Sequence, residues 1–200
     1  MTRLGIFGGT FDPPHIGHLL AATDAAEALD LDILWFVPNA TQPLKGAGQG
    51  SPADRLEMIK RLAATGESFA VDAMEIERDG LSYTVDTVAA FAARFPSATR
   101  FLLIGADVTE TFAQWREPRR IRELADLVVL HRGSSGSADL MNPGSSRAAT
   151  PHLDGARWLQ TRRIDVSSTE VRERVRAGKS IRGFVPDAVA EYIAAAGLYR

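Results

Sequence analysis

The sequence predicts an α/β protein built on a doubly wound parallel sheet with helices on both faces. Short apolar segments of strand length alternate with longer, helix-like segments along the chain. This strand–helix–strand order favours parallel strands joined by crossover helices. The first apolar segment also ends in glycines that lead into a helix, and sheets of this class bind ligands beyond the carboxyl ends of their strands.

Strands are expected where a short apolar segment stops at glycine, proline or a polar cluster. The segments are 3–8, 33–38, 69–76, 100–106, 126–132 and 162–166. Helices are expected in the segments rich in alanine, leucine and charged residues. They are 15–29, 51–64, 83–95, 118–125, one that begins at Ser168 and one near 187–196. The clearest helix start has Ser51 as the cap, Pro52 at the first helical position and Asp54 at the third.

The composition is that of a globular protein, with 45% hydrophobic and 24% charged residues. We expect one domain over residues 1–200, whose helical end begins at about residue 167. A net charge of −2 argues against a nucleic-acid partner for the whole chain. The absence of cysteine excludes disulfides and thiolate metal sites, and it fits a reducing cytoplasm. Without a signal peptide or a long apolar segment, we expect a cytoplasmic protein with no membrane contact. A homo-oligomer stays open.

Two segments interrupt the alternation. Residues 133–152 are rich in serine, glycine and alanine, and 44–52 are rich in glycine. Such segments are expected to be flexible. Each is interpreted either as a lid over a nucleotide or as a plain surface insertion.

The turn after the first strand has the features of a phosphate site. Gly8 and Gly9 carry no side chain, so a ligand can approach the backbone N–H groups closely. Asp12 is expected to cap the next helix, whose amino end would attract an anion. His15 and His18 are three residues apart and would share a face of the first helical turn.

Other interpretations of these motifs fit less well. The glycines lack G-x-G-x-x-G spacing, and the AGKS segment at 177–180 lacks the first glycine of a P-loop, since Glu173 stands there. A zinc site on a helix would normally have histidines four apart with a glutamate between them. A packing role for both histidines is the remaining structural alternative.

A second helix start lies late in the chain, in VSSTEVR at 166–172. Ser167 and Glu170 have the spacing of a capping box, and capping alone is the simple interpretation. Arg172 is close enough to this helix start to face an anion bound there. Two such helix starts on one sheet could hold a triphosphate between them.

These two motifs resemble the signature of the nucleotidyltransferase superfamily. HIGH at 15–18, inside GGTFDPPHIGH, is similar to the (T/H)-x-G-H box, and VSSTEVR is similar to I-S-S-T-x-x-R with Val166 in place of isoleucine. The resemblance implies the Rossmann-like form of the predicted sheet. Class I aminoacyl-tRNA synthetases share the first box, but they need a longer chain, a KMSKS loop and a tRNA-binding domain.

Within the superfamily, the chain resembles the bacterial nicotinate-nucleotide adenylyltransferases along nearly all its length. The similar segments are 36–45, 75–88, 103–115 and 184–199. The chain departs from that family at Leu44, where many relatives have histidine, and after Arg132, where they often have a shorter R-P-G-Y segment.

The resemblance implies adenylyl transfer from ATP to nicotinate mononucleotide, with Mg²⁺ as the counter-ion of ATP and with ATP and nicotinate mononucleotide as partners. It assigns the α-phosphate to His18 and the leaving phosphates to His15. The other implied ATP contacts are Gly8, Gly9, Thr10, Phe11, Gly105, Asp107, Ser168, Thr169 and Arg172. The implied mononucleotide contacts are Lys45, Tyr83, Thr84, Trp115 and Arg132, with additional charge from Lys45 toward the phosphates.

The acceptor residues also have simpler interpretations. The hydroxyl of Thr84 and nearby amides at a helix start would hold a carboxylate, and Trp115 could stack on a pyridinium ring. By spacing alone, SYTVDT is an amphipathic helix start with Tyr83 packed beside it, and Trp115 is a core or surface aromatic residue. The alternative functions are phosphopantetheine adenylyltransferase, nicotinamide-mononucleotide adenylyltransferase and a nucleotide sensor without turnover.

Overall fold

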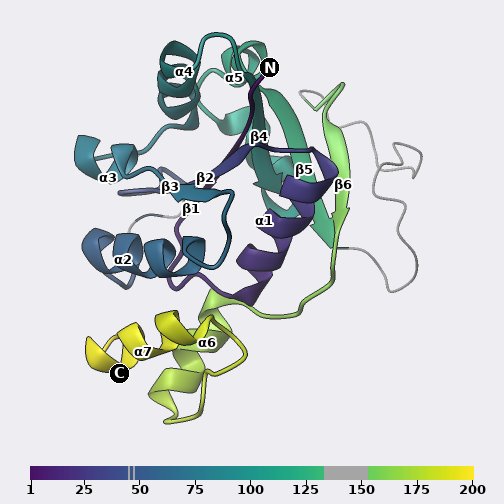
Figure 1. The fold of residues 1–200 in the computed structure, drawn as a ribbon. Coiled ribbons are helices and arrows are strands. Elements are labelled where there is room, and N and C mark those ends of the chain that lie inside the picture. Colours follow the sequence, from purple (N-terminus) through teal and green to yellow (C-terminus); the bar gives the residue numbers. More distant parts are fainter. Residues whose placement is uncertain (45, 47, 133–152) are drawn as a thin grey trace.

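The computed structural model describes residues 1–44, 46, 48–132 and 153–200 (Figure 1). Its strands form one parallel sheet of order β3-β2-β1-β4-β5-β6 within the described residues. The strands are β1 (Arg3–Gly9), β2 (Ile33–Pro38), β3 (Phe69–Val71), β4 (Thr99–Gly105), β5 (Asp126–Arg132) and β6 (Arg157–Thr161). The order reverses between β1 and β4, and this switch point is where such sheets bind ligands. The predicted doubly wound parallel sheet is therefore confirmed.

Helices cover both faces of this sheet. They are α1 (Ile16–Ala28), α2 (Pro52–Ala63), α3 (Met74–Arg78), α4 (Thr84–Arg94), the 3₁₀ segment η1 (Ala106–Gln114), α5 (Pro118–Leu124), α6 (Ser168–Arg176) and α7 (Asp187–Ala195). Phe7 of β1 belongs to the core shared with α1, α2 and α7, and its neighbour Ile6 belongs to the core shared with α4, η1 and α5. This alternation is the side-chain period of a strand buried on both faces.

The C-terminal helices bring distant parts of the chain together. In Figure 1, α6 and α7 lie beside each other and carry the C-terminus close to α2. Tyr192 of α7 donates to Asp54 of α2 over 2.8 Å. Within the described residues, no helix combines the length and the apolarity that crossing a membrane requires.

Two strand predictions are wrong. In each case an aspartate carboxylate accepts a hydrogen bond from a backbone N–H of the expected strand, which therefore does not bond within the sheet. The strand expected over 69–76 ends at Val71, because the carboxylate of Asp72 accepts from the N–H of Met74 and starts α3. The strand expected over 162–166 lies earlier, at Arg157–Thr161. The N–H of Arg162 donates instead to buried Asp24 of α1, over 2.7 Å.

The helix caps were predicted with mixed success. Ser51 and Ser167 cap α2 and α6 as expected, since each hydroxyl accepts from the amide three residues later. Asp12 does not cap α1. The N-cap of α1 is His15, and the Asp12 carboxylate accepts instead from other segments of the chain.

Candidate active site

A cavity of about 1040 Å³ opens at the carboxyl ends of the strands. Its walls come from the β1–α1 turn, the segment after β2, the starts of α4 and α6, and η1 with its end. The site residues expected from sequence that line it are Gly8, Gly9, Thr10, Phe11, His15, His18, Tyr83, Thr84, Gly105, Asp107, Trp115, Ser168, Thr169 and Arg172. The fold therefore gathers both groups of expected contacts around one space.

Some expected contacts cannot be placed in this way. Lys45 and the segment 133–152 lie outside the described residues, and so does the side chain of Arg132, the last residue of β5. Leu44, which stands where relatives often have histidine, lines the cavity with about half of its surface exposed (52%).

The two histidines cap α1 reciprocally. Nδ1 of His15 accepts from the N–H of Gly17, and Nδ1 of His18 accepts from the N–H of His15, each over 3.1 Å. The ring centroids lie 3.8 Å apart. In a neutral imidazole one nitrogen accepts and the other carries the proton. The caps therefore place the proton of both rings on Nε2. An Nε2–H group can donate to an anion, and the helix start attracts one.

The amino end of α6 meets the β1–α1 turn. The hydroxyl of Ser168 donates to the carbonyl oxygen of Pro13 over 2.8 Å, and Nη1 of Arg172 donates to the carbonyl oxygen of Asp12 over 2.7 Å. The second guanidinium nitrogen, Nη2, donates to the hydroxyl of Thr169 over 3.0 Å. The starts of α1 and α6 therefore converge on one cavity, as the sequence predicts.

Arg172 has one buried donor that its described neighbours do not satisfy. Its Nε is buried and has no hydrogen-bond partner among the described residues. A buried donor without a partner costs about 1–3 kcal/mol, and the residue that carries it lines the cavity between the two helix starts. Ser168 differs, because its hydroxyl proton already serves the turn.

The opposite wall contains the start of α4. Tyr83 is its N-cap and Thr84 its first residue, and no side chain caps this helix start. The guanidinium of Arg116 lies 5.0 Å from the centroid of the Tyr83 ring. Trp115 ends η1 and packs on Phe112 with the ring centroids 5.2 Å apart. This wall therefore combines helix-terminal amides, a hydroxyl and aromatic rings.

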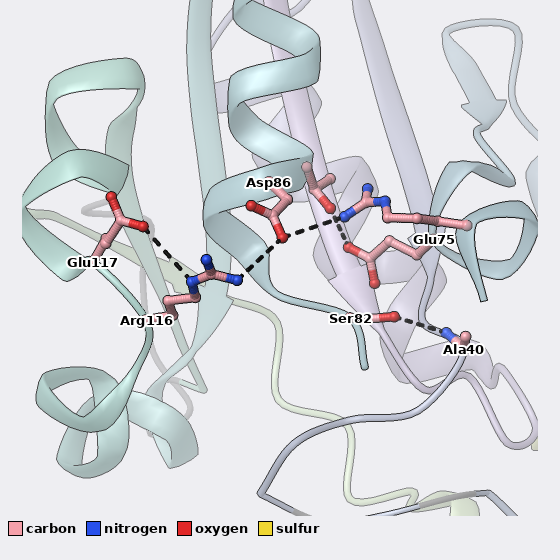
Figure 2. A network of polar contacts seen from close by, with 8 residues as sticks. Ala40, Glu75, Ser82, Asp86, Arg116 and Glu117 are labelled. Atoms are coloured by element: carbon pink, nitrogen blue, oxygen red, sulfur yellow. Dashed lines mark hydrogen bonds and ion pairs between the residues drawn. The ribbon is translucent and has the colours of Figure 1, made fainter. Parts of the chain in front are cut away.

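A buried carboxyl group supports this wall (Figure 2). Glu75 of α3 is 7% exposed and accepts from the hydroxyl of Thr87 over 2.5 Å. Ser82 bonds to Glu75 as well, and its hydroxyl accepts from the N–H of Ala40 over 3.0 Å. Burial raises the pKa of Glu75, opposed by its hydrogen bonds to Thr87 and Ser82. Glu75 thus connects α3, α4 and the segment after β2.

An exposed charge network lies beside it. Figure 2 shows Asp86 between two arginines, with Arg78 3.6 Å away and Arg116 3.9 Å away. Arg116 also lies 3.7 Å from Glu117. Exposed ion pairs stabilise the fold only slightly, but the arginines offset a negative charge in the first turn of α4. They therefore make this helix start more favourable for an acid ligand.

Sequence reasoning missed Arg55, Glu75 and Asp12 as supporting residues. Arg55 is fully buried, and the sequence contains a pattern that could have predicted this. At helical spacing, Arg55 shares the apolar face of α2 with Met58, Ile59 and Leu62. Glu75 was expected on a strand, and no local pattern marks it as buried. Asp12 was expected only as a cap.

Paired imidazoles and two helix starts at the switch point of a parallel sheet define a nucleotide-binding transferase site. The cytidylyltransferase-like family model matches residues 6–174. A relative from Gemmatimonas aurantiaca is 52% identical over 198 residues, with 99% of this chain and 92% of that protein covered. One from Shouchella clausii is 39% identical over 200 residues, covering 100% and 97%. Both are named "Probable nicotinate-nucleotide adenylyltransferase".

Solved structures of low sequence identity share the fold. Plasmodium falciparum nicotinic acid mononucleotide adenylyltransferase complexed with NaAD has a TM-score of 0.73 and 16% identity, with 100% of this chain and 98% of that chain covered. The same protein complexed with APC has a TM-score of 0.72 and 15% identity, with the same shares covered. These structures show the fold alone. The family model and the relatives show that the chain belongs to the cytidylyltransferase-like nucleotidyltransferases and, within them, to the nicotinate-nucleotide adenylyltransferase family.

Proposed function

We propose that the protein transfers the adenylyl group of ATP to nicotinate mononucleotide, which yields nicotinate adenine dinucleotide and pyrophosphate. One observation carries the proposal. A single cavity contains two converging helix starts suited to phosphates and, on its other wall, an uncapped helix start with aromatic rings suited to a pyridine carboxylate. The names of the relatives at up to 52% identity support the same reaction.

The reaction needs positioning more than proton transfer. The mononucleotide phosphate is already an anion, so its oxygen can attack the α-phosphorus of ATP in line without a general base. The bond from the α-phosphorus to the bridging oxygen breaks, and pyrophosphate leaves with that electron pair. Catalysis then consists of alignment and of stabilising negative charge on the phosphates.

On the donor side, His18 would contact the α-phosphate through Nε2–H and His15 the leaving phosphates. The Nδ1 acceptor bonds orient both rings for this role. Arg172 and the amides at the start of α6 would hold the β- and γ-phosphates, and the place of Arg172 in the cavity lining supports this assignment. Gly8 and Gly9 leave room for the phosphate chain, while Gly105 and Asp107 at the end of β4 would border the adenosine.

On the acceptor side, Thr84 and the first amides of α4 would bind the carboxylate that distinguishes nicotinate from nicotinamide. Trp115 would stack on the electron-poor ring. These assignments predict a preference for the acid over the amide.

Mg²⁺ would enter as part of the MgATP substrate. The described residues contain no group of three histidine, aspartate or glutamate side chains suited to a metal. At nucleotide sites Mg²⁺ is commonly held mainly by phosphates and water, and the proposal takes the ion to be held in that way. Cytoplasmic localisation belongs to the same proposal, because a chain without cysteine fits a reducing compartment.

The test is a substrate panel. The purified protein is incubated with MgATP and, in separate reactions, nicotinate mononucleotide, nicotinamide mononucleotide or phosphopantetheine. Pyrophosphate release gives kcat/KM, and mass spectrometry identifies the product. We expect the largest kcat/KM with nicotinate mononucleotide. Pyrophosphate release with phosphopantetheine alone, or binding of ATP without turnover on any acceptor, would contradict the proposal.

A further inference from the structure

The carboxylate of Asp12 is the meeting point of three segments of the chain. Asp12 is 5% exposed. One carboxylate oxygen accepts from the N–H of Gln49 over 2.6 Å, and the other accepts from the N–H of Gly50 over 2.9 Å and from the hydroxyl of Tyr199 over 2.7 Å. Burying a carboxylate without hydrogen bonds costs free energy, and these three donors offset that cost.

The segment on the other side of Asp12 is shaped for this contact. A Cβ atom on Gly50 would lie 2.9 Å from a carboxylate oxygen of Asp12 and 3.1 Å from the hydroxyl of Tyr199. A Cβ atom on Gly48 would lie 3.1 Å from the other carboxylate oxygen. Glycine at both positions lets the backbone approach the carboxylate closely. Gly48 and Gln49 also line the cavity, in contact with Asp12 of the β1–α1 turn.

The main chain of the turn is fixed independently of that carboxylate. Arg172 and Ser168 hold the carbonyl oxygens of Asp12 and Pro13, and Arg55 holds that of Thr10 over 2.8 Å. The Asp12 side chain therefore projects from a rigid turn. Its carboxylate holds the facing segment 48–50 through the N–H groups of Gln49 and Gly50, while Arg55 bonds to the carbonyl oxygen of Gly50.

Tyr199 orients that side chain from the C-terminal end of the chain. It follows α7, in a backbone conformation with a φ of 63°. Burial and the Asp12 carboxylate raise the pKa of the Tyr199 hydroxyl far above its usual range. The hydroxyl is therefore a permanent donor, and its bond keeps one carboxylate oxygen directed at the N–H of Gly50.

We propose that Asp12 is a positioning residue, oriented by Tyr199, that connects the phosphate-binding turn to the segment 48–50, of which Gly48 and Gln49 line the cavity. This inference depends on the proposed function, because the turn, Gly48 and Gln49 line the cavity in which the two phosphates would react. Neither side chain needs to touch a substrate. Together with Arg55 they hold the segment 48–50 against the turn, and a displacement of about 1 Å in such an alignment can cost about 10²-fold in rate.

The experiment compares two tyrosines. Tyr199→Phe removes the hydroxyl that bonds to Asp12. Tyr192→Phe is a matched control, because it removes a hydroxyl from the same end of the chain that bonds to Asp54 over 2.8 Å, outside the cavity lining. The full-length variants are assayed for kcat and for KM toward ATP and nicotinate mononucleotide. Thermal unfolding is followed in parallel.

We expect Tyr199→Phe to lower kcat about tenfold with both KM values within about twofold of the wild type, as loss of alignment does. Tyr192→Phe should keep the wild-type kcat, and each variant should unfold a few degrees lower. Equal kcat losses in the two variants, or an unchanged kcat in Tyr199→Phe, would overturn the inference. An inactive wild type would instead refute the proposed function.

Asp12→Asn is the second variant and keeps the test decisive if Tyr199→Phe does not fold. The asparagine has nearly the same size but only one acceptor oxygen, so it cannot serve all three donors. We expect a folded protein with a larger loss of kcat than Tyr199→Phe. A folded Asp12→Asn protein with wild-type kcat would show that the walls are positioned without this carboxylate.

Discussion

Arg55 offers a direct test of what holds the phosphate-binding turn in place. Its side chain is 0% exposed. The guanidinium donates to the carbonyl oxygens of Thr10, Ala40 and Gly50 over 2.8, 2.9 and 3.3 Å, and to the side-chain oxygen of Asn39 over 3.4 Å. Replacing Arg55 with methionine keeps much of the volume and removes every donor.

The expected loss of stability follows from these contacts. Removing one member of a buried charged network commonly costs about 3–5 kcal/mol. The substitution also removes a charge that is costly to bury, so part of this free energy is recovered. The cost is evident because burial lowers the pKa of Arg55 even with Asp12 nearby. We therefore expect the lower end, about 3 kcal/mol, and a Tm about 6–12 °C lower for a chain of this size.

The assay is urea unfolding followed by circular dichroism, with linear extrapolation to water. Lys60→Met is the control, because Lys60 is exposed on the same helix, and its free energy of unfolding should stay within about 0.5 kcal/mol of the wild type. Arg55→Lys keeps the charge but not the planar fork of donors, so it should lose nearly as much as Arg55→Met. The contacts of Arg55 predict a loss of about 3 kcal/mol in Arg55→Met. A loss under about 1 kcal/mol would show that Arg55 does not hold the turn in place.

Three further predictions concern the cavity itself. His18→Ala should lower turnover by about 10²-fold, the scale for losing one transition-state donor, while circular dichroism shows an intact fold; near-normal turnover would remove His18 from the site. Thr84→Val should raise KM for nicotinate mononucleotide far more than KM for ATP, and an unchanged ratio of acid to amide activity would contradict its role. Glu75→Gln should change the pH dependence of stability. The raised pKa of Glu75 means that the folded wild type loses stability as pH rises from about 4.5, the ordinary value, through the folded pKa. Between pH 4.5 and 8, the free energy of unfolding of Glu75→Gln should therefore rise relative to that of the wild type. If urea unfolding shows the same difference between the two proteins at every pH, the prediction is wrong.

The sequence predicts the features that depend on neighbouring residues. Apolar runs locate most strands, and serine caps at Ser51 and Ser167 locate two helix starts. The paired motifs at 15–18 and 166–172 predict which helix starts converge, because the carboxyl ends of parallel strands share one edge of the sheet. These are local signals, or consequences of a parallel sheet.

The failures arise where a side chain competes for a backbone group. Asp72 and Asp24 each accept from an amide that a strand could have used, and Asp12 serves partners 37 to 187 residues away. The apolar pattern contains no information on such partners. Glu75 shows the same limit, because its burial depends on Thr87 and on Ser82, which meet it only in the folded chain.

Residues 48–50 of the glycine-rich segment 44–52 show what composition alone does not reveal. Its glycines predict flexibility, yet Gly48 and Gly50 have a different use, since a Cβ atom would be in tight contact with Asp12 at Gly48 (3.1 Å) and too close to it at Gly50 (2.9 Å). The carbonyl oxygen of Gly50 also accepts from buried Arg55, so the segment is held on both sides at this point. A glycine needed for close approach and a glycine in a flexible loop look the same in a sequence. Only the partner separates them, and here that partner is a carboxylate whose third donor, Tyr199, is the second-last residue of the chain.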